Sequence, residues 1–345
     1  MVGAAMGGME ISIAINGIQI QGLLHATVTL SNCFSSDSYA LTFAMGPAPL
    51  SDIPFWASVS SAYVEVSVLA TYEPTSQSMI TGMVDTVIVD PIHRTVSIEG
   101  RDLSSSLIDA YRQEDVVNQS ASEVVSAIAQ HHGLSAVVTP TSGNVGRYYG
   151  DGYTRLSLGQ FSRLRSDWDL VVQLARENSF DVFVEGTTLF FQPSTDALAV
   201  PVRIAPQNVQ AMRIERALAI NSDVKARVQS WNSQNMTSYE SNNNTNTTEA
   251  VPPPQTSGSQ PFLFSASNFT LQQTTLTAER YASELVRLST VLHLEMPWDL
   301  SLSPRMSILL DDTGSSFDGM YRIDAIERHY NSISGSTQNI RAIHV

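Results

Sequence analysis

The chain has 345 residues and a mass of 37.6 kDa, enough for two or three domains. Charged residues make up only 15% of it, and 33 acidic side chains outnumber 19 basic ones, of which Lys225 is the only lysine. A net charge of −14 excludes a protein whose main task is to grip nucleic acid, because that needs a basic surface. No apolar run of about 18 residues occurs, so we expect no membrane insertion. The single cysteine, Cys33, excludes internal disulfides.

Residues 10–100 have the pattern of an antiparallel β-sheet. Isoleucine alternates with polar residues over 11–15 and again over 18–20. Between these segments lies Asn16-Gly17, the dipeptide that most strongly favours a two-residue hairpin. Further alternating segments recur at short spacing, which predicts a β-sandwich or barrel, with one short helix between 47 and 60.

The middle of the chain predicts a small α+β domain. Ser120 and Glu123 have the spacing of a capping box and precede an apolar stripe at helical spacing, which Gly133 should end. A second helix is predicted over 167–178 with Ser166 as N-cap. Two strands should follow it, at 180–184 and 187–191.

The C-terminal part returns to β-structure. Strands predicted at 213–220 and 224–231 would pair across Asn221-Ser222, and a polar stretch from Asn232 to Gln260 reads as a long exposed loop or insertion. A helix over 277–291 with an Arg280–Glu284 pair should follow. The final strands are predicted at 306–310, 321–330 and 338–345. The likeness of the two β regions suggests a duplicated barrel.

The predicted domains are a first β-barrel at 1–103, an α+β domain at 104–200 and a second β-barrel at 201–345. The fold class is thus mainly β, with two antiparallel barrels flanking a small helix-containing domain.

No motif in the sequence predicts a catalytic, cofactor or metal site. The seven histidines lack chelating spacing, and the adjacent pair His131-His132 fits a helix end better than a metal site. The acidic group Asp311, Asp312 and Asp318 lacks the spacing of a calcium loop and is expected in a hairpin turn. Pairs of carboxylates are too common here to exclude a glycosidase by inspection.

Arg101 and Asp102 follow Gly100 at the end of a predicted strand. We expect a structural ion pair at a domain junction there rather than a catalytic pair. Arginine suits such fixed contacts because its guanidinium can form two hydrogen bonds with one carboxylate.

Several of these segments resemble phage baseplate hub proteins of the late-control-D type, the hub above the spike in contractile tails. The segments Thr81–Asp85, Ser97–Leu103 and Leu107–Asp109 are similar to the end of that family's first barrel. The middle segment and the C-terminal segments Leu302–Arg305 and Tyr321–Ile326 follow the family's order. The motif residues are Gly82, Asp85, Gly100, Arg101, Asp102 and Asp109.

The resemblance implies a structural, non-enzymatic homotrimer without cofactors. Three chains would form a pseudo-sixfold ring that joins a hexameric tail tube, or a distal tail protein, to a trimeric spike and other baseplate proteins. The protein would be assembled in the bacterial cytoplasm and reside in the virion. DNA would pass through without specific binding, and the −14 charge suggests an acidic channel wall that repels phosphates.

Two alternatives remain open at this point. One is a tail-associated cell-wall hydrolase acting through two carboxylates. The other is a carbohydrate-binding β-protein that uses exposed aromatic side chains, for which Trp231 and Tyr239 are the candidates.

Overall fold

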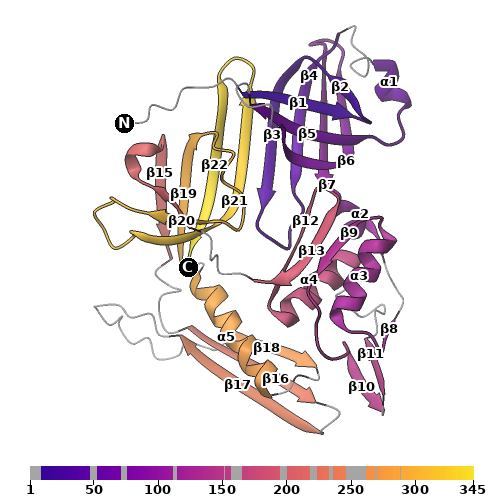
Figure 1. Cartoon of the computed structure of the whole chain (residues 1–345), viewed down its shortest axis with the longest axis vertical. Coiled ribbons are helices and arrows are strands. Elements are labelled where there is room, and N and C mark those ends of the chain that lie inside the picture. The colour runs from indigo at the N-terminus through magenta and orange to yellow at the C-terminus, as the bar shows by residue number, and fades with distance from the viewer. Residues whose placement is uncertain are drawn as a thin grey trace.

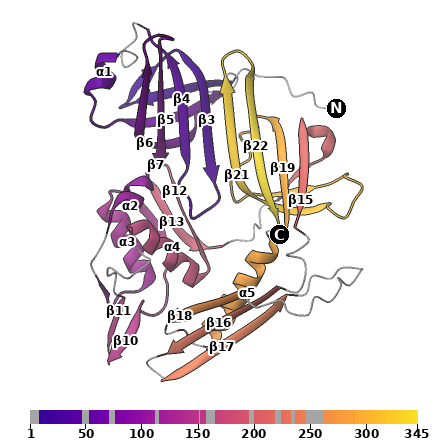
Figure 2. The ribbon, with the colours of Figure 1, turned by 180° about the vertical axis from the view of Figure 1, so that it is seen from behind.

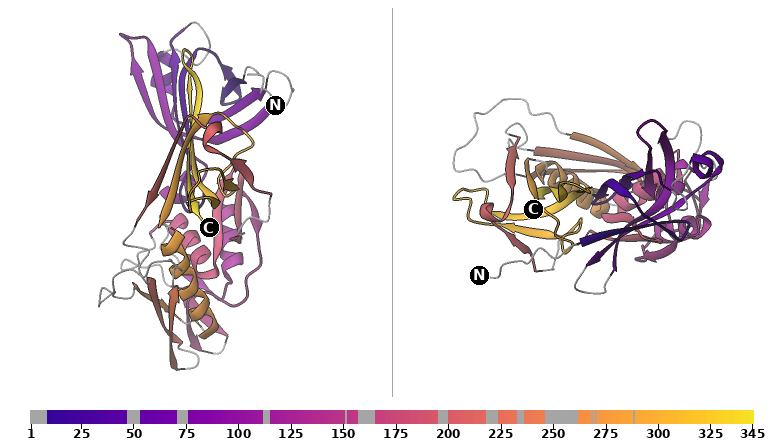
Figure 3. Two further views of the ribbon diagram at one scale, coloured as in Figure 1. Left: turned by 90° about the vertical axis from the view of Figure 1, so that its left-hand side faces the viewer. Right: turned by 90° about the horizontal axis from the view of Figure 1, so that it is seen from above.

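The computed structural model is mainly β, with its strands in one large and three small sheets (Figure 1). The described residues are 9–46, 53–70, 76–111, 115–150, 152–156, 165–194, 200–217, 224–232, 236–245, 262–267, 269, 271–287 and 289–345. Within them no helix is long and apolar enough to cross a membrane. The two β regions lie side by side when seen from above (Figure 3), and the smaller sheets lie below them (Figures 1 and 2).

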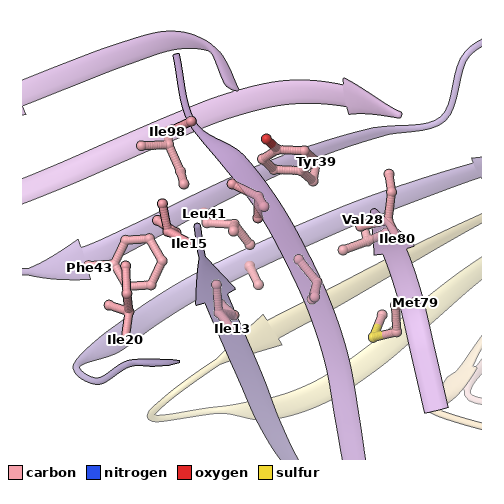
Figure 4. Packing of buried hydrophobic residues seen from close by; sticks show 14 of the residues in the cluster. Ile13, Ile15, Ile20, Val28, Tyr39, Leu41, Phe43, Met79, Ile80 and Ile98 are labelled. Atoms are coloured by element: carbon pink, nitrogen blue, oxygen red, sulfur yellow. The ribbon is translucent and has the colours of Figure 1, made fainter. Parts of the chain in front are cut away.

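The first β region follows the predicted alternation. Asn16 and Gly17 have φ angles of 50° and 79°, so the predicted two-residue hairpin is confirmed. Alternate side chains of the strands point into one apolar core that includes Ile13, Leu41 and Ile98 (Figure 4). Its elements are β1 (Met9–Ile15), β2 (Ile18–Ile20), β3 (Leu23–Ser31), β4 (Ser38–Ala44), α1 (Ile53–Ser58), β5 (Tyr63–Ala70), β6 (Ser76–Asp90) and β7 (Thr95–Asp102).

The middle region is α+β, as predicted, and has its own apolar core. The capping box of Ser120 and Glu123 forms at the start of α3, and Ser166 caps α4 in the same way. Gly133 follows α3 with a φ of 70°, a backbone conformation that glycine adopts without strain. The elements are α2 (Ser105–Asp109), β8 (Val116–Val117), α3 (Ala121–His131), β9 (Ser135–Val138), β10 (Arg147–Gly150), β11 (Tyr153–Leu156), α4 (Asp167–Asn178), β12 (Phe180–Glu185) and β13 (Thr188–Pro193).

The C-terminal region contains a third core that includes Leu292, Tyr321 and Ile340. Its elements are β14 (Val202–Ile204), η1 (Pro206–Asn208), β15 (Ala211–Arg216), β16 (Val224–Asn232), β17 (Thr237–Thr245), β18 (Phe262–Ser267), α5 (Leu271–Arg287), β19 (Thr290–Pro297), β20 (Ser307–Leu310), β21 (Gly319–Asn331) and β22 (Gly335–His344).

The predicted pairing of 213–220 with 224–231 is wrong. β15 pairs with β19, whereas β16 pairs with β17 and β18 in a separate three-stranded sheet. β15 belongs instead to the large sheet, where its half-buried Met212 and Ile214 pack against the third core. The turn residues Asn221 and Ser222 lie outside the described residues.

The stretch 232–260 is not wholly a loop. Its residues 237–245 form β17 despite their polar composition, because the ladder to β16 satisfies their backbone groups. Residues 233–235 and 246–260 lie outside the described part. The helix α5 covers this small sheet and begins and ends earlier than the predicted 277–291. Leu292 and Leu294 alternate into the third core, so their segment forms β19 rather than the end of a helix.

The described strands do not form the two separate closed barrels that the sequence predicts. The two β regions share one 13-stranded sheet, in the order β15-β19-β22-β21-β3-β4-β7-β6-β5-β1-β2 with β20 and β14 off this path. The junction is the antiparallel pairing of β3 with β21, from Ser31 opposite Ala325 to His25 opposite Asn331. This pairing satisfies one edge of each region, that of β3 in the first and that of the second half of β21 in the other.

The two regions repeat one strand order. The path β3-β4-β7-β6-β5-β1 corresponds to β15-β19-β22-β21-β20-β14. The last pair differs in direction, because β1 is antiparallel to β5 and β14 is parallel to β20. The suggested duplication is therefore visible in the topology, although the expected barrels are not.

The connection between β3 and β4 joins all three regions. The indole of Trp168 donates a hydrogen bond to the carbonyl of Phe34 at 3.2 Å, and the guanidinium of Arg305 donates to the carbonyl of Asn32 at 2.6 Å. A buried ion pair of 2.8 Å between Arg322 on β21 and Asp181 on β12 fixes the middle region to the C-terminal one. Loss of one partner would leave a buried charge uncompensated.

Asp37 lies at the end of this connection and titrates abnormally. Its carboxylate accepts hydrogen bonds from the backbone N–H and the hydroxyl of Ser31, at 2.6 and 3.0 Å. Burial, together with the neighbouring carboxylate of Asp102, raises the pKa of Asp37 to about 7. The folded protein therefore holds this proton to a higher pH than the unfolded chain, in which an aspartate has a pKa of about 4.

We predict that this group makes the protein less stable as pH rises from about 4 to about 7. Over that window the folded state binds more protons than the unfolded state, so the free energy of unfolding falls. The variant Asp37→Asn, whose side-chain oxygen can still accept from Ser31, should remove this part of the slope in urea unfolding. The exposed Asp312→Asn should keep it. Parallel pH profiles of wild type and Asp37→Asn would contradict the prediction.

Candidate functional site: the polar face of the sheet

Arg101 is held between two carboxylates on the polar face of the sheet. Its Nε and Nη2 donate to the two oxygens of Asp85 at 2.7 and 3.0 Å, and Nη2 also donates to Asp109 at 2.9 Å. These hydrogen bonds raise the pKa of Arg101, so it stays charged. Asp109 lies in α2, so the cluster joins the first β region to the start of the middle one. The partners differ from the predicted neighbour, Asp102.

Asp85 reaches Arg101 because the strand is bulged there. Val84 pairs with Gly100 and Thr86 with Glu99, so Asp85 has no residue opposite it. A bulge of this kind turns one side chain out of the regular alternation. Here it brings a carboxylate to the guanidinium on the polar face.

Asp102 points the other way and is buried. It accepts hydrogen bonds from the hydroxyls of Ser36 and Ser104, at 2.7 and 2.5 Å. Burial raises its pKa, while these hydrogen bonds act in the opposite direction. Its contacts are those of a structural carboxylate that holds the β3–β4 connection and the start of α2 together.

Gly82 and Gly100 have no side chain, so neighbouring backbone can lie close to both, and the ring of Tyr39 can lie close to Gly100. A Cβ on Gly82 would lie 2.0 Å from the carbonyl oxygen of Arg101. A Cβ on Gly100 would lie 2.1 Å from that of Met83 and 2.4 Å from the hydroxyl of Tyr39. Of the six predicted motif residues, the structure thus brings Asp85, Arg101 and Asp109 into one cluster and uses the other three in packing around it.

Two hollows lie on this polar face. One has a volume of about 400 Å³ over β3, β4, β6 and β7, and the other about 540 Å³ over β15, β19, β21, β22 and β3, with Thr29 lining both. The polar face of the sheet is the surface that lines these two hollows, and it runs across both repeats. Its charged lining residues are Asp85, Glu99, Arg101, Arg213, Glu295, Glu327 and Arg341.

Carboxylates are in surplus on the polar face. Each of its three arginines already has a carboxylate partner: Arg101 has Asp85, Arg213 has Glu215 and Arg341 has Asp324. Glu99 and Glu295 form no ion pair with any described residue. The face therefore presents uncompensated negative charge beside neutralised arginines.

Asp324 is not among the residues predicted from the sequence. This residue is the bulge of β21, between Ile323 and Ala325, and it forms an ion pair with Arg341, which lies opposite Ala325. Arg101 is placed differently, because it lies opposite Met83, before the bulge of β6. The signal that could have found it is the shared pattern Val84-Asp-Thr-Val87 and Ile323-Asp-Ala-Ile326, an aspartate followed by a small residue between two aliphatic ones.

The other candidates do not form a chemical site. No group of three or more histidine, cysteine or acidic side chains in the described ranges could hold a metal ion. His132, at the end of α3 as expected, contacts Asp167 at 2.8 Å. Trp231 and Tyr239 point to opposite faces of their small sheet, because Tyr239 lies opposite Ser230 rather than Trp231. They cannot stack on one sugar together.

We predict that Gly100→Ala destabilises the protein by about 1–3 kcal/mol, since the new methyl group must displace backbone and ring atoms. Gly150→Ala is the matched control, because a Cβ there meets no atom within 4 Å. It should change stability by less than about 0.5 kcal/mol. Urea unfolding of both variants measures the difference, and equal midpoints would refute the close contact.

No protein-family model matches the sequence, and no curated protein is similar to it in sequence. Solved structures do match it. A 43 kDa tail protein of prophage MuSo2 from Shewanella oneidensis is 15% identical, with a TM-score of 0.71 over 98% of each chain. A tail protein from Neisseria meningitidis is 12% identical, with a TM-score of 0.69 over 98% of this chain and 96% of that one.

A third match is a component of the type VI secretion system from E. coli, itself similar to the T4 bacteriophage tail proteins gp27 and gp5. It is 12% identical, with a TM-score of 0.59 over 96% of this chain and 76% of that one. The predicted resemblance to phage tail proteins is thus confirmed as a structural match over nearly the whole chain. The chain has the fold of phage and phage-like tail proteins.

Proposed function

We propose that the protein is a structural baseplate hub of a phage or phage-like tail. The observation that carries this proposal is the full-length match to phage tail proteins. The repeated strand order supports it, because two equivalent units per chain would let three chains present six similar units. Such a homotrimer could join a sixfold tail tube or distal tail protein to a threefold spike and to other baseplate proteins.

In the proposed ring, each chain would be divided at residues 103 and 200 into a first tube-like β unit, the middle region and a second tube-like β unit. The middle region would lie outside the two β units. The barrel would be completed between chains rather than within one. The motif residues Asp85, Arg101 and Asp109 would fix the first unit to the middle region. The protein would act without catalysis or cofactor and would reside in the virion after assembly in the host cytoplasm.

The polar face is the candidate wall of the channel. Its surplus carboxylates, among them Glu99 and Glu295, would repel DNA phosphates and let a genome pass without being held.

We predict that the purified protein, or the protein in a tail preparation, forms rings of three copies. Light scattering across a concentration series measures the mass, and electron microscopy of isolated particles measures the symmetry. Removal of the gene should stop tail assembly, while a purified sample should not clear peptidoglycan. A stable dimer, or cell-wall clearance lost on replacing one carboxylate, would contradict the proposal.

We predict that the assembled wild type does not retain double-stranded DNA in a filter-binding assay. The double variant Glu99→Lys with Glu295→Lys should gain retention that weakens with added salt, because its face becomes basic. A control with the same charge change at the exposed Asp312 and Glu279, both outside this face, should gain less. Retention by the wild type, or equal gain in both variants, would count against an acidic wall.

A further inference from the structure

Among the described strands, several edges of the large sheet are open: those of β2 and β14, that of β15, and one side of β6 over its second half. β15 pairs with β19 on one side, and no described strand pairs with its other side. In β6 the first half pairs with β5 as far as Met83, but among the described strands residues 86–90 pair only with β7. Open edges of this kind are templates for pairing with another strand.

The two repeats are equivalent in detail around their bulges. Asp85 in β6 corresponds to Asp324 in β21, since each is the unpaired residue of its strand. The residue before each bulge makes the same hydrogen bond: Val84 N–H donates to the carbonyl of Ala62 at 3.0 Å, and Ile323 N–H to that of Met306 at 2.8 Å. Before the bulge, β6 pairs with β5 and β21 pairs with β20.

After the bulge, the two strands differ. Residues 325–331 of β21 pair with β3, whereas residues 86–90 of β6 have no such partner in the part of the chain that the structure describes. The strand order makes β15 the equivalent of β3. Within one chain β15 and β6 lie far apart in the sheet order, so β15 of the same chain cannot fill this place.

We propose that residues 86–90 of β6 pair with β15 of a second copy of the chain, antiparallel and in the register of the β3–β21 ladder. Aligning the two bulges aligns Glu327 with Ile88 and His329 with Asp90. The same alignment can be carried across the sheet, from β7 through β4 to β3 and from β22 through β19 to β15. It then aligns Thr29 with Glu215 and Thr27 with Arg213. The assigned register sets Ile88 opposite Glu215, Val89 opposite Ile214 and Asp90 opposite Arg213.

The chemistry of the two edges fits this register. Asp90 and Arg213 are of opposite charge, and the arginine side chain is 75% exposed in the single chain. Arg213 would then lie between Glu215 of its own strand and Asp90 of the second copy, which already contacts His93. Val89 and Ile214 are both half-buried and packed toward the apolar cores, so their pairing would extend the core across the contact. Ile88, 52% exposed, would be covered by the neighbouring strand. In the β3–β21 ladder, Thr27 and His329 stand at the places of Arg213 and Asp90. There the hydroxyl oxygen of Thr27 lies 3.3 Å from Nδ1 of His329.

The contact joins different surfaces of the two copies, so it repeats head to tail and closes a ring when the rotation permits. It rests on the proposed hub function and names the residues that would build it.

The test is a pair of cysteines at the assigned register. Ile88→Cys with Glu215→Cys should give disulfide-linked dimers and trimers on oxidation of concentrated protein, seen by non-reducing electrophoresis. The matched control is Ile88→Cys with Arg216→Cys, since the side chain of Arg216 points to the other face of β15. Native Cys33 can remain, because burial raises the pKa of its thiol to about 12, which leaves little thiolate for disulfide formation, and the wild type reports any crosslink through it.

A charge series at the same exposed site gives an independent readout. Ile88→Glu would place like charges opposite Glu215 and should weaken association about two- to fivefold per contact, whereas Ile88→Lys should not. Glu215→Lys should rescue Ile88→Glu. Circular dichroism checks that each variant is folded.

The outcomes separate this contact from the hub function. If the wild type is trimeric but the two cysteine pairs crosslink equally or not at all, the register is wrong and the hub function stands. If the wild type stays monomeric at high concentration and in tails, and no pair crosslinks, both are overturned.

Discussion

The pairing of β3 with β21 is the contact on which the rest of the structure depends. It turns two β units, each with its own core, into one continuous sheet. The polar face is continuous only because of it, with Thr29 lining both hollows. The ion pair of Arg322 with Asp181 then holds the middle region beneath this joint, so the relative position of all three regions follows from one ladder and its neighbours.

Charge and composition take on meaning once the sheet is in view. The arginines of the polar face are each neutralised within the chain, and the acids that remain give the face its sign. A surface poor in lysine also suits faces that pack against neighbours, because long flexible side chains lose entropy when they are fixed. Both features fit the structural role proposed above.

Local signals predicted local structure well. The capping boxes at Ser120 and Ser166, and the hairpin at Asn16-Gly17, depend on neighbours in sequence, and all three form as expected. The partner of β15 could not be found in this way, because more than 70 residues separate it from its pair in β19. Closed barrels were expected for the same reason: alternation shows that strands exist but not which edges meet. Around Arg101, the spacing showed a structural cluster but not its partners, because only the bulge at Asp85 turns that carboxylate toward it.

The two repeats differ most in how their first two strands are connected. β3 is joined to β4 by residues 32–37, whereas β15 is joined to β19 by 217–289, which carry β16, β17, β18 and α5. At the opposite end the hairpins are alike and short, at 91–94 between β6 and β7 and at 332–334 between β21 and β22. In a ring of such chains, one rim would show six near-identical hairpins and the other would alternate short and long connections. In such a ring a single gene product would carry two symmetries, one on each rim, and the rims would be distinguished by the length of these connections.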